Sequence, residues 1–361
     1  MSIIYILSDF GKLIKKGETL QLKKDESIYK TIFPYKTEQL ILIGKTEITH
    51  SALQVLMKHR IETIFLGTNG RYNGKLEFQT GKNVFLRRTQ FQLLDDMEFR
   101  LQFAKSVAMG KMKNQLSFMQ RIKRKQPKNS SRTIENAIHK MNILIRNAET
   151  VDTLESLRGY EGNGAKQFFS VFKQAIHPHF ANFNGRSMHP PKDNVNAVLS
   201  FVYTLLFYRL VGAIEAAGLD SHVGYFHTLD YGKKTLAFDL MEEYRTPIGD
   251  TLTASLFNLG ILKPDNFRTE AFSTDDIEYP LEPATDNDGP GTDITTQKGV
   301  LLTKDGLKKT ISQFERKLDT ALYYPPSEKS VTYRQIIHRQ VEHFKRVINK
   351  NEKAYRPIET K

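Results

Sequence analysis

The spacing of the apolar residues changes once along this chain, close to Arg87 and Arg88, and that change constrains the fold most. Before it, short apolar runs alternate with turn residues, as strands do, at residues 3–7, 19–22, 39–44 and 61–66. After it, apolar residues recur at helical spacing from Thr89 to about Lys125. We therefore predict an α+β fold, in which a β-rich N-terminal domain (1–87) precedes a larger all-helical C-terminal domain (88–361).

Local patterns add detail to both domains. Residues 49–59 are predicted to form a helix with Thr49 as its N-cap, and the Asn-Gly pairs at 69–70 and 73–74 are typical of turns. In the second domain we expect helices at residues 131–148, after Tyr160, and at 194–217, 238–259 and 332–350. The N-terminal domain is expected to serve as a platform for packing or dimerisation.

The sequence gives little sign of a membrane or a secreted setting. The most apolar stretch, 197–217, contains Arg209 and Glu215, and its uninterrupted part is shorter than the ~20 residues that a span needs. We expect a buried core helix there and no membrane partner. The start of the chain lacks a basic leader, so we expect a cytoplasmic protein. The absence of cysteine excludes disulfides, thiolate zinc sites and a cysteine nucleophile.

The charge is large and unevenly distributed. The chain carries a net charge of +13, but residues 269–297 contain eight acidic side chains and no Lys or Arg. Those 29 residues carry −8, so that the other 332 carry +21. A body this basic favours nucleic acid as the partner, although charge that only keeps a protein soluble gives the same count. The acidic stretch, which also contains Pro and Gly, is predicted to be an exposed loop or insertion.

Glu161, His227 and Glu242 are three potential metal ligands. Two carboxylates and an imidazole are the ligand set of a catalytic divalent-metal site. Asp239 lies three residues before Glu242 beside a helical apolar stripe, so both carboxylates project from a common face, as they also would on an ordinary acidic helix. Glu161 lies among small residues that suit a helix start, where its charge would equally favour the helix dipole. His227 follows an apolar pair, where a structural histidine is also common. Together, in a basic protein, these residues predict a Mg²⁺ or Mn²⁺ site for phosphate chemistry.

Several competing catalytic motifs are absent from the sequence. It contains no Gly-x-x-x-x-Gly-Lys-Ser/Thr phosphate loop, no His-Glu-x-x-His and no Gly-x-Ser-x-Gly. Hydrolysis of a nucleoside triphosphate in a phosphate loop is therefore not expected.

A set of segments spread over nearly the whole chain resembles one known family. The matching residues are 48–49, 52–53, 61–66, 70–74, Arg87, Arg88, Gln90, Lys111, 114–115, 158–162, 190–191 and 193–197, and the most specific block is 218–245. At these residues the sequence resembles the CRISPR-associated integrase, the universal first Cas protein of the spacer-adaptation module, which is often called its endonuclease.

The resemblance implies a site. In that family a Glu, a His and a Glu or Asp bind the metal, and these positions fall on Glu161, His227 and Glu242 here. Asp239 matches an acidic position that approaches the metal in some members, so it is a tentative fourth ligand. The implied cofactor is Mg²⁺ or Mn²⁺, and the implied catalytic domain is the helical one.

The resemblance also implies partners. The family forms homodimers, and two such dimers flank a dimer of a small ferredoxin-like second CRISPR-associated protein in a heterohexamer. The substrate would be double-stranded DNA, whose backbone Lys166, Arg186 and Arg245 would hold. His189 stands where many members have Arg before the Pro pair, so one DNA contact is expected to be weakened or replaced.

The implied reaction is transesterification, in which a 3′-hydroxyl of a captured DNA fragment attacks a phosphodiester at the edge of the CRISPR repeat. Hydrolysis of DNA is the same chemistry with water as the nucleophile. Two other interpretations stay open from the sequence. One is a non-catalytic nucleic-acid-binding scaffold of the same fold, and the other is an unrelated helical metal-dependent nuclease that does not join ends.

Overall fold

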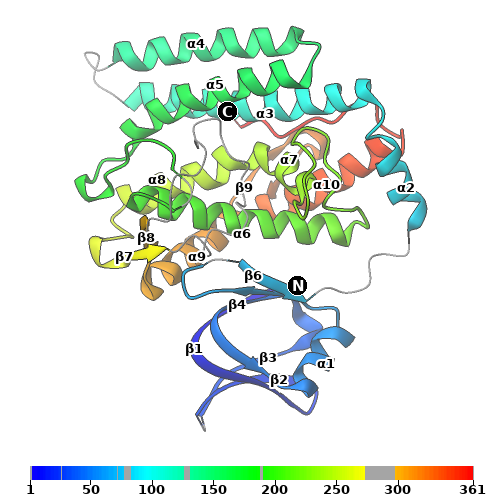
Figure 1. Ribbon diagram of the computed structural model, residues 1–361, viewed down its shortest axis with the longest axis vertical. Coiled ribbons are helices and arrows are strands. Elements are labelled where there is room, and N and C mark those ends of the chain that lie inside the picture. The colour runs from blue at the N-terminus through cyan, green and yellow to red at the C-terminus, as the bar shows by residue number, and fades with distance from the viewer. Residues whose placement is uncertain are drawn as a thin grey trace. The chain divides into compact units, whose positions relative to one another are not determined.

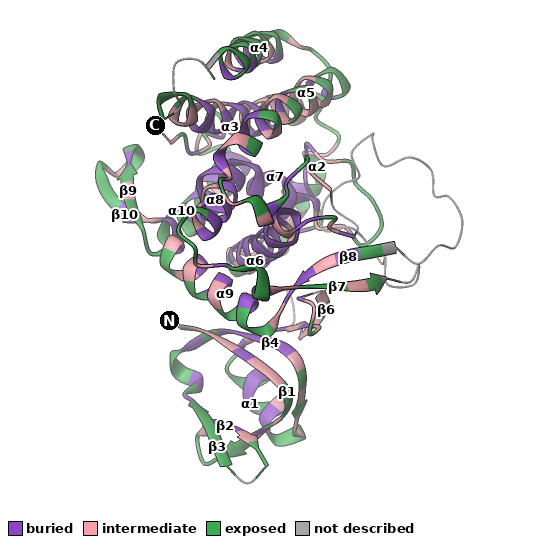
Figure 2. Cartoon of the chain, turned by 90° about the vertical axis from the view of Figure 1, so that its left-hand side faces the viewer, coloured by how far each residue is buried: buried purple, intermediate pink, exposed green. Residues whose placement is uncertain are grey.

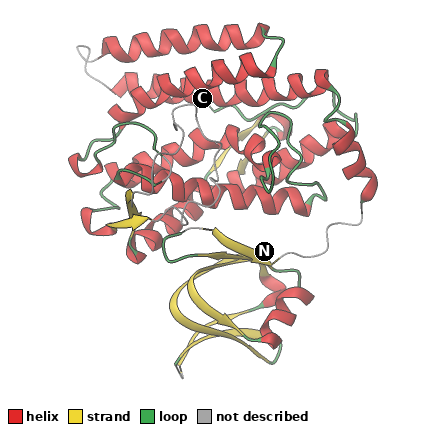
Figure 3. Cartoon of the chain, in the orientation of Figure 1, coloured by secondary structure: helices red, strands yellow, loops and turns green. Residues whose placement is uncertain are grey.

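The computed structural model describes residues 2–25, 27–70, 72–76, 83–125, 131–187, 190–272 and 297–360. The chain divides into two compact units, residues 1–80 with 302–308 (unit 1) and residues 81–301 with 309–361 (unit 2). Figure 3 shows that unit 1 is built on a β-sheet and that unit 2 is mostly helical. The predicted α+β class, with β structure first and helices after it, is confirmed.

Unit 1 is a six-stranded mixed sheet with one helix. Its elements are β1 (Ser2–Lys16), β2 (Thr19–Lys24), β3 (Ser27–Ile32), β4 (Thr37–Ile48), α1 (His50–Lys58), β5 (Glu62–Leu66) and β6 (Tyr72–Leu76). The strand order is β3-β2-β1-β4-β5-β6, in which β4 pairs in parallel with both β1 and β5 and the other pairs are antiparallel. Apolar side chains of α1 and of the sheet form one buried cluster, and β2 accordingly alternates between buried and half-buried residues.

Two local predictions for unit 1 have different outcomes. The helix with Thr49 as its N-cap is confirmed, because the Thr49 hydroxyl accepts a hydrogen bond from the Ala52 N–H at 3.3 Å. The turn at residues 69–70 is also present, closed by Gly70 N–H donating to Gly67 O at 2.9 Å. The turn predicted at 73–74 is wrong: both residues lie inside β6, because pairing with β5 overrides the preference of an Asn-Gly pair.

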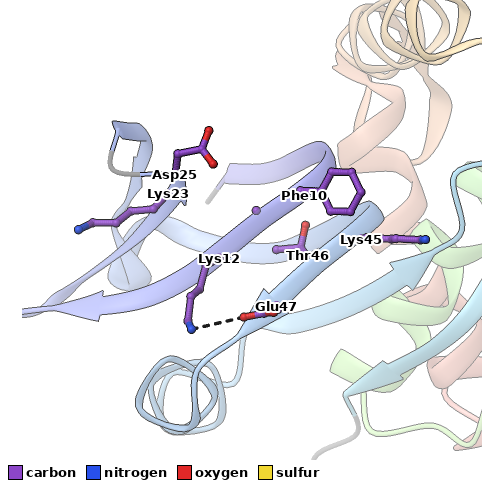
Figure 4. A pocket seen from close by; sticks show the side chains of 8 residues that line it. Phe10, Lys12, Lys23, Asp25, Lys45, Thr46 and Glu47 are labelled. Carbon is purple, nitrogen blue, oxygen red and sulfur yellow. Dashed lines mark ion pairs between the residues drawn. The ribbon is translucent and has the colours of Figure 1, made fainter.

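An open pocket of about 580 Å³ lies on unit 1 (Figure 4). Its lining mixes cations and anions with an exposed ring: Phe10, Gly11, Lys12, Lys23, Asp25, Lys45, Thr46 and Glu47. Two of these charges neutralise each other, because Lys12 Nζ forms an ion pair with Glu47 Oε2 at 3.4 Å. None of the predicted site residues lies here. The dimerisation role of this domain stays a prediction.

Unit 2 contains the remaining elements, shown in Figure 1. The helices are α2 (Val84–Gln92), α3 (Met97–Lys125), α4 (Ser131–Thr150), α5 (Leu154–Phe172), α6 (Asn194–Ala216), α7 (Thr235–Tyr244), α8 (Thr251–Asn258), α9 (Lys304–Leu318, whose first residues belong to unit 1) and α10 (Tyr333–Ile348). The strands are β7 (Phe267–Phe272) paired with β8 (Gln297–Leu302), and β9 (Ala321–Tyr324) paired with β10 (Lys329–Thr332). α3, α4 and α5 pack on one another, and α3 also packs on α7.

α6 is a long helix of unit 2 whose residues are mostly buried. By length and composition it could cross a membrane, but 89% of its most apolar window is buried (Figure 2). The prediction of a core helix is therefore confirmed. Its start is fixed by Asp193, whose carboxylate accepts a hydrogen bond from the Asn196 N–H at 2.8 Å. Arg209, which interrupts the apolar run, pairs with Glu315 Oε1 at 2.7 Å.

Other predictions for unit 2 need correction. The helix expected from residue 89 is two helices, α2 and α3. The helix expected at 238–259 is interrupted by a π-helical segment, Arg245–Asp250, because Pro247 lacks the N–H that an α-helical ladder needs. The two strand pairs and α9 were not predicted. Of the acidic stretch 269–297, only residues 269–272 and 297 are described, in β7 and β8, and the rest lies outside the described residues.

Candidate active site

Glu161 lies within α5, not at its start. The helix begins at Leu154, and the Thr153 hydroxyl caps it by accepting a hydrogen bond from the Ser156 N–H at 3.2 Å. The predicted position at a helix start is therefore wrong, and so is the dipole argument that depended on it. A Cβ added at Gly159 or Gly162 would meet nothing, so these glycines do not mark a close approach of another segment of the described chain.

The loop that carries His227 is fixed to α5 and to α7. Arg158 on α5 donates to the Phe226 carbonyl through Nε at 3.1 Å and Nη2 at 2.7 Å. Gly224 lies against the first turn of α7, where an added Cβ would come within 2.7 Å of Asp239 Oδ2 and 2.6 Å of the Thr235 carbonyl carbon. Only glycine permits this approach, which explains the Gly-Tyr-Phe-His pattern before α7.

Asp239 orients His227. Its Oδ1 accepts hydrogen bonds from the His227 N–H at 2.9 Å and from Nδ1 at 2.7 Å. Its Oδ2 accepts two more, from the N–H groups of Tyr225 at 2.6 Å and Phe226 at 3.0 Å. With Nδ1 held in this way, Nε2 of the imidazole faces Glu242 Oε1 at 3.7 Å. A carboxylate that fixes the ring orientation is the usual outer partner of a metal-binding histidine.

Lys111 of α3 connects the two glutamates. Its ammonium forms an ion pair with Glu161 Oε1 and another with Glu242 Oε2, the latter at 2.7 Å. Arg245 approaches from the other side, and its Nε donates to Glu242 Oε1 at 2.9 Å. The structure thus brings the predicted triplet together: Glu161 and Glu242 flank one ammonium, and His227 faces Glu242. Lys111 belongs to the sequence resemblance, which implies no role for it.

The charges of this cluster hold one another in the ionised form. Burial by itself would raise the pKa of Glu242, but the nearby Arg245, Lys111 and His227 outweigh it and lower the pKa to about 2. Burial by itself would lower the pKa of Lys111, but Glu161 and Glu242 outweigh it and raise the pKa. The cluster therefore consists of a buried carboxylate, Glu242, and a half-buried one, Glu161, arranged around a positive charge.

The side chains of Glu161, His227 and Glu242 are of the types that bind a divalent cation. In this structure the ammonium of Lys111 lies between the two glutamates. In the described part of the chain, no group of three His, Asp or Glu side chains lies at metal-binding spacing. Glu242 Oε2 is buried, and the charge that it faces is the Lys111 ammonium 2.7 Å away. A buried carboxylate oxygen near a second carboxylate and an oriented imidazole is suited to Mg²⁺ or Mn²⁺. The side chains fit such an ion if the Lys111 ammonium moves aside.

The three predicted DNA contacts lie in different surroundings. Arg245 is buried and its guanidinium lies over the Tyr203 ring at 4.7 Å. Arg186 donates to the Ser187 carbonyl at 2.7 Å and holds its own loop. Lys166 is exposed on α5. DNA contact stays a prediction for all three, and His189 lies outside the described residues.

The comparisons with known proteins identify the family. Residues 4–274 match the family model described as CRISPR associated protein Cas1. The chain belongs to the Cas1 family. It is 32% identical over 272 residues to the CRISPR-associated endonuclease Cas1 1 of Chlorobaculum tepidum, covering 74% of this chain and 79% of that one. It is 28% identical to Cas1 3 of Thermus thermophilus, covering 94% and 92%. The predicted family resemblance is confirmed.

Solved structures share the Cas1 fold over the whole chain. A CAS1 protein from Thermotoga maritima has a TM-score of 0.77 at 20% identity, covering 98% of this chain and 99% of that one. A casposase described as bound to an integration product has a TM-score of 0.79 at 21% identity, covering 100% and 95%. At these identities the likeness shows the fold alone.

Proposed function

We propose that this Cas1-family protein is a metal-dependent DNA nuclease and integrase. It would join the 3′-hydroxyl ends of captured DNA fragments into a CRISPR repeat array and would also hydrolyse DNA. Two similar Cas1 proteins are named endonucleases, and the casposase is described with an integration product. The observation that supports the proposal is that Glu161 and Glu242 both pair with the Lys111 ammonium, while His227 Nε2 lies 3.7 Å from Glu242 Oε1.

Glu161, His227 and Glu242 would hold Mg²⁺ or Mn²⁺. The bound ion would lower the pKa of the attacking hydroxyl and offset the negative charge that develops on the phosphate. In the joining reaction a donor 3′-oxygen forms a new P–O bond, the old P–O3′ bond breaks, and the leaving 3′-oxygen takes a proton. One phosphodiester replaces another, so no nucleotide cofactor is required.

Neighbouring side chains prepare these groups. Asp239 uses both carboxylate oxygens on His227 and on the two residues before it, so we assign it the orientation of the imidazole rather than metal binding. Arg245 fixes the second oxygen of Glu242. The tentative role of Asp239 as a fourth ligand is therefore replaced by a positioning role.

The proposed partners are duplex DNA, a second copy of the chain and a Cas2-type protein. The +21 charge outside the acidic stretch suits the backbone of DNA. A structure described as a Cas6-RT-Cas1–Cas2 complex has a TM-score of 0.81 at 21% identity, and this chain covers 36% of the longer chain there. We propose the homodimer and the heterohexamer with a small ferredoxin-like partner on this basis.

One observation favours the alternative of a non-catalytic scaffold: an ammonium occupies the place between Glu161 and Glu242. The two functions are separated by incubating the purified protein, with and without its partner, with Mn²⁺, an end-labelled donor duplex and a supercoiled target that carries a repeat array. The nuclease and integrase should transfer label to the target, and EDTA should stop this transfer while DNA binding persists. Binding without any Mn²⁺-dependent product would establish the scaffold instead.

Replacement of Asp239 by Asn tests its positioning role. Asn has one acceptor oxygen and no charge, so it cannot accept all four of the hydrogen bonds that Asp239 accepts. His227 should therefore lose its fixed orientation. We expect both Mn²⁺ affinity and joining rate to fall about 10- to 100-fold, the usual effect of losing an outer partner. Calorimetry with Mn²⁺ gives the affinity, and the labelled-donor assay gives the rate. Unchanged Mn²⁺ affinity would show that His227 needs no such support.

A further inference from the structure

The last described residues, 351–360, form no helix or strand and run beside α3 in Figure 1; we refer to them as the C-terminal strap. The match to the Cas1 family model ends at residue 274, so the strap lies beyond it. The strap is nevertheless packed into unit 2, because Tyr355 is 3% and Ile358 is 7% exposed. Chain ends are usually poorly ordered unless specific contacts hold them.

The strap supplies the partners of Glu243, the residue next to Glu242. Glu243 Oε1 accepts a hydrogen bond from the Tyr355 hydroxyl at 2.6 Å, and its Oε2 accepts one from the Ile358 N–H at 2.6 Å. The side-chain amide of Gln340 on α10 donates a third, at 3.1 Å. A buried carboxylate is costly without such donors. Two of these three come from the strap, so α7 depends on it.

Asn114 joins the same strap to α3, one turn after Lys111. Its Nδ2 donates to the backbone carbonyls of Glu243 at 3.0 Å and Ile358 at 2.9 Å. Its Oδ1 accepts from the N–H of Thr360 at 2.8 Å and from the hydroxyl of the same residue at 3.0 Å. Both donors and both acceptor positions of this amide are filled. One buried side chain therefore fixes α3, α7 and the strap to one another beside the ion cluster.

Close packing fixes α3 again at the residue before Lys111. A Cβ added at Gly110 would lie 2.5 Å and 2.6 Å from the ring carbons of Pro357, so only glycine lets the strap lie this close. The ring of Tyr355 stacks on His343 of α10, with centroids 5.1 Å apart. The strap is therefore clamped between α10 and α3.

We propose that the C-terminal strap is a positioning element of the candidate site. It holds α7, which carries Glu242, against α3 through Glu243 and Asn114, and thereby keeps the Glu242 carboxylate in its place in the site. This inference rests on the proposed function, since it concerns the same site. The π-helical segment Arg245–Asp250 directly follows α7 and lacks the regular α-helical ladder, so the end of α7 needs support from outside the helix.

The test compares two single substitutions in the strap. Tyr355→Phe removes the hydroxyl that donates to Glu243 and keeps the packed ring. Glu359→Ala is the matched control, because Glu359 is exposed and its ion pair with Lys113, at 2.9 Å, lies on the surface. For Tyr355→Phe we expect the joining rate at saturating donor DNA and the Mn²⁺ affinity each to fall about tenfold or more, with the KM for donor DNA unchanged. The control should match the wild type in all three.

The measurements are made well below the melting temperature of each variant, so that every molecule is folded. A strap that only stabilises the fold would lower the melting temperature of Tyr355→Phe and leave its rate and Mn²⁺ affinity unchanged, which would overturn the inference. Removal of residues 355–361 provides a stronger variant, with the same expected pattern if it folds. If the shortened protein does not fold, the comparison of Tyr355→Phe with the wild type decides whether the strap positions the site.

Failure of the inference and failure of the proposed function give different results. If the wild type binds no Mn²⁺ and joins no DNA, the proposed function is wrong and the positioning role falls with it. If the wild type does both and Tyr355→Phe equals it, only the strap inference is wrong.

Discussion

Replacing either Glu161 or Glu242 by Gln is expected to abolish strand joining. Gln has nearly the same shape as Glu but lacks the charge that would hold a divalent cation. The ion supplies several kcal/mol of transition-state stabilisation, so product formation should fall about a thousandfold or more. Rates from the labelled-donor assay with Mn²⁺ measure the loss. Affinity for donor DNA should stay within about twofold, because it depends on many basic side chains.

Glu155→Gln is the matched control for this experiment. Glu155 lies on α5 like Glu161, but it is exposed in the first turn and belongs to no ion pair that we describe. It should join DNA at the wild-type rate. His227→Ala should be as inactive as the two Gln variants. Full joining by His227→Ala would show that the assigned site is not the catalytic one.

Helices were predictable from the sequence where a single capping residue or one continuous apolar run determines them. Thr49 begins α1, and the long apolar run forms the buried α6. The interruption of the helix after Tyr244 was not predictable from its apolar stripe, because the stripe continues through Pro247 with the same spacing. Tertiary packing decides whether such a proline ends a helix, kinks it or widens one turn.

The candidate site was predictable in part. Local patterns and a family resemblance selected the triplet, but the sequence placed Glu161 at a helix start, where the structure has the third turn of α5. The resemblance includes Lys111, but no local pattern gave it a role that Lys113 or Lys123 lacks. Its position between two carboxylates depends on how α3 packs on α5 and α7, and a sequence does not report such packing directly.

Of the substitutions that we propose, Lys111→Met is expected to lower the free energy of unfolding of the metal-free protein most. The Lys111 ammonium lies between two carboxylates whose side chains are only 18% and 3% exposed. Met preserves most of the side-chain volume but leaves Glu161 and Glu242 facing each other without the charge between them. Removing one partner of a buried ion pair costs about 3–5 kcal/mol. Urea or thermal unfolding in EDTA measures this loss directly.

Added Mn²⁺ should offset a large part of that loss, because the ion would take the place of the ammonium. Wild-type protein must displace Lys111 to bind the ion, whereas Lys111→Met offers the two carboxylates without competition. The variant should therefore bind Mn²⁺ more tightly, and at 100 times its Kd the ion returns about 2.7 kcal/mol of stability. Lys166→Met, on the exposed surface of α5, is the matched control and should respond to Mn²⁺ as the wild type does. If Mn²⁺ stabilised Lys111→Met no more than the wild type, the ammonium would not occupy the metal position, and Glu161 and Glu242 would have to be reassigned as a structural ion cluster.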